Sequence, residues 1–143
     1  MKTKQSLRIP AEIDKLDVVR DFVERNVKAF GADEITTFNL VLSVDEAVSN
    51  IIVHGYQNIP GNLDIDIGKR GAKLTVRIRD DAPHFDPTQV PIPDLTIPLE
   101  ERSEGGLGVF FIRQLTDKVD HRITRDGKNE LIMTKIISGG KAG

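Results

Sequence analysis

The chain contains no cysteine among its 143 residues. This absence excludes disulfide frameworks, thiolate nucleophiles and zinc sites built on thiolates. The sequence also lacks any apolar run approaching the roughly 20 residues that a membrane-spanning helix needs. The basic start MKTKQSLRIP is followed by no apolar run, so it is not typical of a secretory signal. We therefore expect a cytoplasmic protein without a membrane partner.

An excess of charge of one sign is lacking as well. The formal net charge is -2, and acidic and basic residues alternate along the chain. Without a basic stripe there is no electrostatic argument for direct binding of nucleic acid. Charged residues make up 29% and hydrophobic residues 38%, which is typical of a folded globular protein. The length predicts one domain over residues 1–143, and one site within it.

The first part of the chain predicts a strand and two helices. Residues 5–9 alternate like a short strand, and Pro10 is expected to open the helix that follows. Apolar residues recur at helical spacing over Leu16–Phe30, with charged residues between them. Asp33 is expected to cap a second, largely apolar helix, which ends at Gly55.

The second part predicts two hairpins and one more helix. The first hairpin has an acidic outward face on one strand and a basic outward face on the other, around a turn at 68–71. The glycines at 105–108 precede the third helix. These elements predict the α+β class, a two-layer α/β sandwich whose mostly antiparallel mixed sheet packs against three helices. The four strands of these two hairpins are predicted at residues 63–67, 74–78, 119–123 and 131–137, in addition to the strand at 5–9.

Residues 80–104 break every periodicity. Five prolines in this segment prevent a regular helix or a central strand. A long loop inside a compact domain is commonly a lid or binding loop, and a disordered insertion is the alternative. Leu95, Ile97 and Leu99 favour the lid, because apolar side chains need something to pack on. We place the lid at about residues 87–104.

Three polar residues interrupt the apolar second helix. Glu46 and Asn50 lie four residues apart, so they project from one face in adjacent turns, and His54 continues the same line. A carboxylate is rarely buried without a partner, because removing its water costs free energy. The three side chains form either a solvated strip or the floor of a pocket, with Glu46 as a base and Asn50 as a metal ligand.

The glycines at 105–108 could bind phosphate. A helix start presents unpaired backbone N–H groups, and glycines leave these groups open to an anion. A simple turn is the alternative for this segment taken alone. The segment is not a P-loop, since no Gly-Lys-Ser/Thr follows it, and it is not a dinucleotide fingerprint, since the third glycine and the preceding strand are missing.

Asp80 stands at the end of a predicted strand, where the proline-rich loop begins. A carboxylate at this position can accept a hydrogen bond from an exocyclic amine such as that of adenine. The small residue Ala82 would let the ring come close. An aspartate that only caps the turn is the alternative interpretation.

Taken in order, three segments resemble the asparagine box and the two glycine boxes of the ATPase superfamily that includes gyrase, histidine kinases and a heat-shock chaperone. These segments are Glu46-x-x-x-Asn50, Asp80-x-Ala82-x-x-Phe85-Asp86-Pro87 and Gly105-Gly106-Leu107-Gly108. The compact length, VDEAVSNIIVHGY and GGLGVFFI are most similar to bacterial anti-sigma-factor serine/threonine kinases. The resemblance covers nearly the whole chain and implies the Bergerat ATP-binding fold, with ATP and Mg²⁺ as cofactors.

The resemblance also implies a role for each matching residue. Asn50 would hold Mg²⁺ through its amide oxygen, and Glu46 would orient or deprotonate the attacking hydroxyl of a protein. Asp80 would bind the adenine amine, and the glycine segment would offer N–H groups to the phosphates. The predicted nucleotide-binding residues are Asn50, His54, Asp80, Ala82, Phe85, Gly105, Gly106, Leu107, Gly108 and Val109.

One departure from the family pattern lies beside Asp80. Ala82 and His84 occupy positions where the family usually has glycine. Alanine disfavours positive φ, so adenine affinity could be reduced or the loop reshaped. Glu46 and Asn50 match the pattern, which argues against an inactive relative.

The resemblance implies a protein serine/threonine kinase that phosphorylates a small antagonist protein, binds a sigma factor and forms a homodimer. A histidine kinase fits less well, because no helices with a phosphoacceptor histidine precede the first strand. Two alternatives remain: an ATP-dependent binding switch without kinase activity, and a structural α+β domain that binds no nucleotide.

Overall fold

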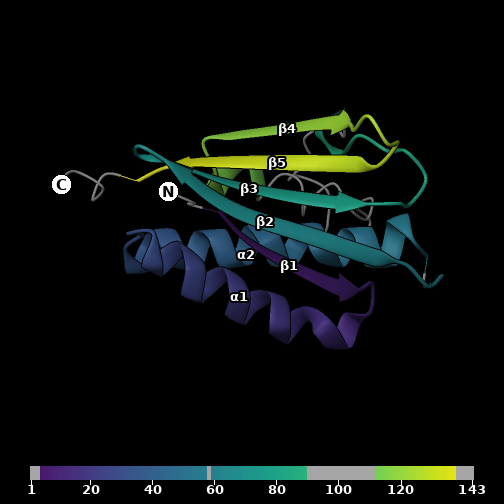
Figure 1. The fold of residues 1–143 in the computed structure, drawn as a ribbon, viewed down its shortest axis with the longest axis horizontal. Helices are drawn as coiled ribbons and strands as arrows, with labels where there is room; N and C mark the ends of the chain where they lie inside the picture. The colour runs from purple at the N-terminus through teal and green to yellow at the C-terminus, as the bar shows by residue number, and fades with distance from the viewer. Residues whose placement is uncertain (1–3, 58, 90–111, 138–143) are drawn as a thin grey trace, which may run out of the picture.

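The computed structural model describes residues 4–57, 59–89 and 112–137. One five-stranded sheet is covered on one face by two α-helices (Figure 1). The strands are β1 (Lys4–Pro10), β2 (Asn62–Arg70), β3 (Lys73–Asp80), β4 (Lys118–Ile123) and β5 (Asn129–Ile136). The helices are α1 (Leu16–Ala29) and α2 (Glu34–Asn50), with three short helical segments η1 (Ile13–Lys15), η2 (Ile51–Gly55) and η3 (Pro87–Gln89).

The sheet has the strand order β1-β2-β3-β5-β4, and all its described pairs are antiparallel. The predicted α+β two-layer sandwich is therefore confirmed, whereas the expected mixture of parallel and antiparallel pairs is not found among the described strands. Because β3 and β5 are antiparallel neighbours, the end of β3 lies beside the start of β5, and Asp80 pairs with Asn129 there.

The two helices begin and end near the residues that the sequence indicates. The side chain of Asp33 caps α2 by accepting a hydrogen bond of 2.8 Å from the N–H of Thr36. Gly31 follows α1 in the left-handed region at φ +108, the usual conformation after a helix end. Residues 112–115 form a helical turn, which is the described part of the predicted third helix.

Three local predictions need correction. Pro10 ends β1 instead of opening a helix, and α1 begins only at Leu16. β1 is an edge strand, where a residue without an N–H is tolerated. The first hairpin turns later than predicted, because β2 continues to Arg70 and Gly71 takes φ +60 in the turn. The second helix does not continue as an α-helix to Gly55, since residues 51–55 form a π-helical turn.

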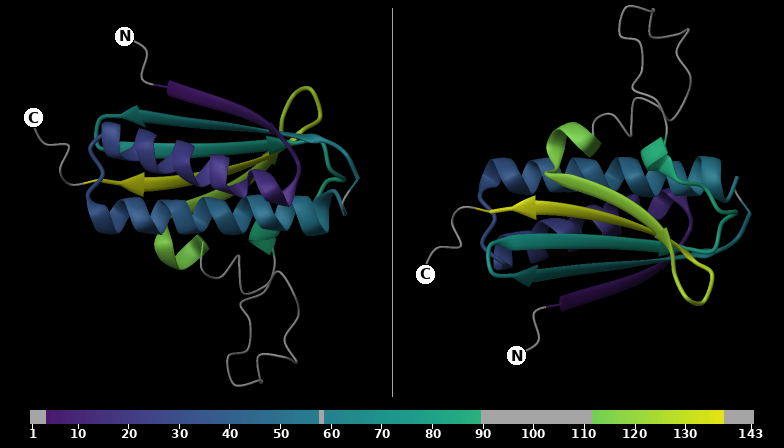
Figure 2. Two further views of the ribbon diagram at one scale, coloured as in Figure 1. Left: turned by 90° about the horizontal axis from the view of Figure 1, so that it is seen from below. Right: turned by 90° about the horizontal axis from the view of Figure 1, so that it is seen from above.

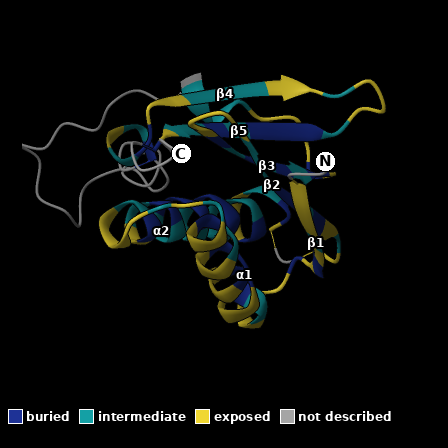
Figure 3. Ribbon diagram, turned by 60° about the vertical axis from the view of Figure 1, so that its left-hand side comes forward, coloured by how far each residue is buried: buried dark blue, intermediate teal, exposed yellow. Residues whose placement is uncertain are grey.

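The core lies between the sheet and the helices, where the buried positions concentrate (Figure 3). Alternate residues of β2 and β3 point toward α1 and α2, as the period of two predicts. Packing of these apolar side chains removes them from water and supplies the main driving force for the fold. The fully buried residues of this core include Val19, Val23, Val27, Val44, Val48, Leu63, Ile65, Ile67, Val76 and Ile78.

The opposite face of the sheet carries an ion-pair network. The side chain of Glu130 on β5 is only 2% exposed, and Arg77, Arg79 and Arg122 all form ion pairs with it. Arg79 also donates a 2.6 Å hydrogen bond to Asp66 on β2. The acidic and basic outward faces predicted for the first hairpin therefore do pair across the sheet.

Among the described residues, no helix combines the length and apolar character needed to cross a membrane.

Candidate functional site

A cavity of about 360 Å³ opens between α2, the end of β3 and the start of β5. Small-molecule sites commonly span roughly 300–1,000 Å³ and combine apolar walls with a few polar groups. Two short helical segments, η3 and residues 112–115, lie on the side of α2 away from α1 (Figure 2). The described lining residues are Ala47, Asn50, Ile51, His54, Gly55, Gln57, Asp80, Ala82, Pro83, His84, Phe85, Pro87, Ile112, His121, Asn129 and Leu131.

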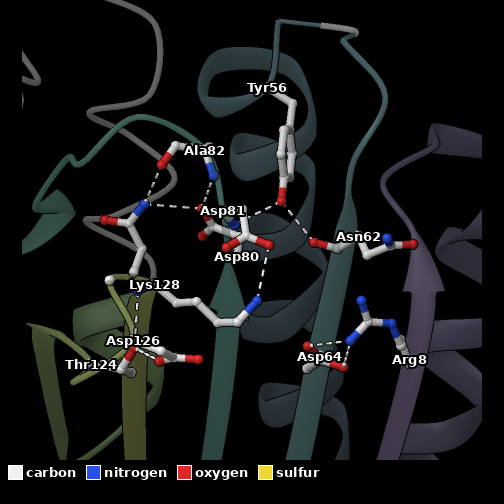
Figure 4. A network of polar contacts seen from close by, with 12 residues as sticks. Arg8, Tyr56, Asn62, Asp64, Asp80, Asp81, Ala82, Thr124, Asp126 and Lys128 are labelled. Atoms are coloured by element: carbon white, nitrogen blue, oxygen red, sulfur yellow. Dashed lines mark hydrogen bonds and ion pairs between the residues drawn. The ribbon is translucent and has the colours of Figure 1, made fainter.

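Asp80 is the buried carboxylate of this cavity, with 5% of its surface exposed. It is the last residue of β3, as predicted. Its Oδ1 accepts hydrogen bonds from the N–H of Ala82 at 2.9 Å and from Nδ2 of Asn129 at 3.0 Å (Figure 4). Burial raises the pKa of Asp80, although these two hydrogen bonds act in the opposite direction. A buried acceptor in a cavity is suited to bind an amine donor.

Asn129 organises the segment that follows Asp80. Besides its bond to Asp80, Nδ2 of Asn129 donates to the carbonyl of Ala82 at 2.9 Å. Its Oδ1 accepts from the N–H of Phe85 at 3.3 Å and contacts Nε2 of His121 at 3.1 Å. One side chain at the start of β5 therefore fixes both the carboxylate and the backbone beside it. Sequence reasoning missed Asn129, because only the β3–β5 pairing brings it opposite Asp80.

A second group of contacts holds the residues that enter the proline-rich segment. Oδ1 of Asp86 accepts a hydrogen bond from the N–H of Thr88 at 2.8 Å and lies 3.8 Å from Nδ1 of His121. Arg113, in the helical turn at 112–115, donates to the carbonyl of Thr88. These contacts connect η3 and the residue before it both to β4 and to that helical turn, segments whose residues Pro87, His121 and Ile112 line the cavity.

The helix changes from an α-helix to a π-helical turn between Asn50 and His54, so these two polar residues lie on different helix types. Asn50, the last residue of α2, and His54 in η2 both line the cavity. The N–H of Tyr56 donates to the carbonyl of Ile51 at 2.8 Å, five residues earlier, which identifies the π-helical turn. Such turns are frequent at functional sites. Glu46 is only half-buried and is not among the residues that line the described cavity.

The departure from the family pattern causes no backbone strain. Among the described residues other than glycine, positive φ is found at Gln57 and not at Ala82. Ala82 therefore does not adopt the conformation that alanine disfavours. A Cβ added to Gly55 would lie 3.2 Å from the methyl group of Ala82, so the two residues face each other closely. Nε2 of His84 contacts the carbonyl of Gly127 at 2.8 Å, which ties this loop to the β4–β5 turn.

Phe85, which is 61% exposed, lines the cavity together with Pro87.

Several other predicted site residues lie outside the described residues. Of the predicted lid at about 87–104, the structure describes only residues 87–89. The predicted phosphate-binding residues Gly105, Gly106, Leu107, Gly108 and Val109 all fall in the part that is not described.

The described residues are compatible with ATP and Mg²⁺. No cluster of three or more metal-ligating His, Cys, Asp or Glu side chains occurs in the described part of the chain. Asn50 lines the cavity, and its amide oxygen could hold a magnesium ion. In nucleotide sites Mg²⁺ takes one or two protein ligands, and phosphates and water complete its coordination. The buried carboxylate of Asp80 suits the base end of the nucleotide.

A family model described as a histidine kinase-like ATPase domain matches residues 9–135. The chain belongs to this family. A protein named serine-protein kinase RsbW from Bacillus cereus (strain AH187) is 29% identical over 140 residues, which cover 94% of this chain and 85% of the relative. The proteins of the same name from Bacillus anthracis and from Bacillus thuringiensis (strain Al Hakam) match with the same identity and coverage. The predicted resemblance to bacterial anti-sigma-factor serine/threonine kinases is thereby confirmed.

A solved structure confirms the fold. The RsbU and RsbW domains of Rv1364c from Mycobacterium tuberculosis superpose with a TM-score of 0.64 at 17% sequence identity. The match covers 93% of this chain but 32% of the longer one, so this ATPase domain corresponds to about a third of that protein. ATP use and a kinase-type ATPase domain are supported by these relatives.

Proposed function

We propose that this chain is a Mg-ATP-dependent serine/threonine protein kinase of the anti-sigma type, which phosphorylates a small antagonist protein. The observation that carries the proposal is the arrangement of two groups in one cavity. The buried carboxylate of Asp80 lies at the end of β3, and the amide of Asn50 lies at the end of α2. The relatives named serine-protein kinase support the class of reaction.

Each residue has a distinct part in the proposed reaction. Asp80 accepts a hydrogen bond from the adenine amine and so orients the base. Asn50 offers its amide oxygen to Mg²⁺, which when bound would neutralise charge on the phosphates. Glu46, one turn before Asn50, orients the protein hydroxyl or accepts its proton. As the family resemblance implies, the backbone N–H groups of Gly106, Leu107 and Gly108 would bind the phosphates, and residues at about 87–104 would form the lid.

The regulatory part of the proposal extends beyond the catalytic residues. The chain would act as a single domain in the cytoplasm and form a homodimer, and it would also bind a sigma factor. These partners follow from the family resemblance, because fold and active site do not by themselves identify a partner.

A second candidate function is an ATP-binding partner-switching module without kinase activity. The position of Glu46 favours it, because this carboxylate is half-buried and does not line the described cavity. A module of this kind would bind Mg-ATP through Asp80 and Asn50 and change its partner affinity, but it would transfer no phosphate.

Phosphate transfer to a candidate antagonist protein separates the two functions. With radiolabelled Mg-ATP, the wild type is expected to label the antagonist on serine or threonine. The Glu46→Gln variant should bind ATP as the wild type does and transfer phosphate about 10²–10⁴-fold more slowly, because it lacks the general base. Glu34→Gln is the matched control on the same helix, since the Glu34 side chain is 87% exposed.

Three results contradict the proposal in different ways. Unchanged transfer by Glu46→Gln would remove the assigned role of Glu46. ATP binding without labelling of any antagonist by the wild type would favour the partner-switching module. Absence of both a calorimetric signal and a thermal shift with saturating Mg-ATP would exclude both functions.

A further inference from the structure

Tyr56, the single tyrosine of the chain, connects three elements beside the cavity without lining it. It directly follows η2, and only 6% of its surface is exposed. Its hydroxyl donates to the carbonyl of Asn62 on β2 at 2.7 Å and accepts from the N–H of Asp81 at 2.8 Å (Figure 4). The hydroxyl therefore uses both its donor and an acceptor position on the backbone of two strand ends.

The ring of Tyr56 is held as firmly as its hydroxyl. A Cβ added to Gly61 would lie 2.3 Å from the ring carbon Cε1 of Tyr56, a distance that real Cβ atoms do not reach. Gly61 is not among the glycines with positive φ, so its lack of a side chain serves the close approach of the ring. Tyr56 is therefore held at its ring by Gly61 and at its hydroxyl by two backbone partners.

The residue next to Asp80 is thus fixed on two sides. Tyr56 binds the N–H of Asp81, and Nζ of Lys128 forms a 2.9 Å ion pair with Oδ2 of Asp81. The Tyr56 bond is the one that acts on the main chain. Because the N–H of Asp81 belongs to the same planar peptide unit as Cα of Asp80, the bond to Tyr56 helps to fix the point from which the Asp80 carboxylate projects.

We propose that Tyr56 is a positioning residue for adenine recognition, and that its hydroxyl places Asp80 to select the exocyclic amine of the base. This inference rests on the proposed function, and deepens it by assigning a determinant of nucleotide specificity. The same residue connects η2, which carries His54 at the cavity, to the turn after β3. The two parts of the nucleotide site therefore share one anchor.

Nucleotide selectivity distinguishes positioning from a purely structural role. Inosine triphosphate differs from ATP by carrying a carbonyl in place of the exocyclic amine, so Asp80 favours ATP over it. Tyr56→Phe keeps the ring against Gly61 but leaves the Asp81 N–H and the Asn62 carbonyl without their partner. We expect the Kd for Mg-ATP to rise about five- to tenfold and the Kd for Mg-inosine triphosphate to change less than twofold.

Two further variants complete the test by calorimetry. Ser43→Ala removes another hydroxyl hydrogen bond, from Ser43 to the carbonyl of Asn39 at 2.8 Å, in α2 and among residues that do not line the cavity. It is expected to leave the ratio of the two Kd values unchanged. Gly61→Ala displaces the tyrosine ring, and it should reduce the preference for ATP as Tyr56→Phe does.

The possible results lead to different conclusions. An equal loss of affinity for both nucleotides, or an unchanged ratio, in folded Tyr56→Phe would overturn the positioning role while leaving the proposed function intact. A wild type that binds neither nucleotide would overturn the proposed function itself. Lower discrimination in Tyr56→Phe and Gly61→Ala, with normal discrimination in Ser43→Ala, would support the inference.

Discussion

At the scale of single residues, Asp80 carries an energetic cost in the absence of a ligand. Burial raises its pKa, so the ionised form is less stable in the folded chain than in the unfolded chain. Asn129 and the N–H of Ala82 offset part of this cost by donating hydrogen bonds to it. A carboxylate kept in an unfavourable environment next to a cavity is typical of a binding residue, because binding sites commonly trade stability for function.

Asp80→Asn is expected to separate binding from stability. The variant should bind Mg-ATP about 10- to 100-fold more weakly, because a hydrogen bond to a charged acceptor is lost and an amide donor can face the adenine amine. Without ligand, the folded variant should be at least as stable as the wild type at neutral pH. Calorimetry measures the first effect and urea unfolding the second.

The pH dependence of this difference has a definite sign. A raised carboxyl pKa means that the folded chain holds its proton more tightly, so the contribution of Asp80 to stability decreases as pH rises from its ordinary value of 3.8 through the folded pKa. The stability of Asp80→Asn relative to the wild type should therefore increase over that interval. A decrease would show that Asp80 is stabilising when ionised.

At the scale of elements, the site depends on the contact between η2 and the turn after β3. Gly55 is the last residue of η2, and Ala82 follows the end of β3. An added Cβ at Gly55 would lie 3.2 Å from the methyl group of Ala82, so the two methyl groups would fit together only if one of the two segments shifted by a few tenths of an ångström. The alanine that departs from the family pattern is thus accommodated by a glycine on the neighbouring element.

A double-mutant cycle tests this dependence. Gly55→Ala in the wild type gains helix propensity but crowds Ala82, so the free energy of unfolding should stay the same or fall. In the Ala82→Gly background the crowding is absent, and Gly55→Ala should stabilise the chain by about 0.5–1 kcal/mol. Urea unfolding of the four proteins gives the coupling energy. Additivity within about 0.5 kcal/mol would contradict the proposed contact.

At the scale of the whole molecule, the two faces of the sheet are stabilised differently. The inner face is apolar and packs on the helices, whereas the outer face buries Glu130 and Asp66 among arginines. Burial acts to raise the pKa of Glu130, but hydrogen bonds from Arg122 and Arg79 outweigh it, and the net pKa is lowered. The same balance, with Ser6 and Arg79 as donors, lowers the pKa of Asp66.

Acid should weaken the fold through this network. A carboxyl with a lowered pKa contributes stability above its unfolded pKa and loses that contribution as pH falls toward its folded pKa. The free energy of unfolding should therefore decrease as pH falls below 4.5, the ordinary value for Glu130. Asp80 opposes this trend, because its protonation favours the folded state.

Glu130→Gln identifies the source of the acid sensitivity. The variant should be less stable than the wild type at pH 7, because Arg77 and Arg122 lose their ion pair with this carboxylate and Arg79 keeps only its pair with Asp66. The two unfolding free energies should converge as pH falls, which urea titrations at a series of pH values would measure. Glu24→Gln, at an exposed ion pair on α1, is the control and should parallel the wild type. A constant difference between Glu130→Gln and the wild type would contradict the assignment.

Much of the fold could be predicted because it depends on local patterns. The alternation of β2 and β3, the apolar periodicity of α1 and the cap at Asp33 are each specified by neighbouring residues. The π-helical turn at residues 51–55 could not be predicted in this way, because Ile51 and Ile52 continue the apolar pattern of the helix before it. It places His54 at the cavity by a backbone change that side-chain spacing does not reveal.

The sequence by itself determined the α+β class, the position of Asp80 at a strand end and the order of the motifs that carry the family resemblance. These properties follow from periodicity and from residue identity along the chain. Only the tertiary structure decided which side chains support Asp80. Along the sequence, Asn129 lies 49 residues after Asp80 and Tyr56 lies 24 residues before it. Strand pairing and close packing bring them together, and no pattern within one segment records such contacts.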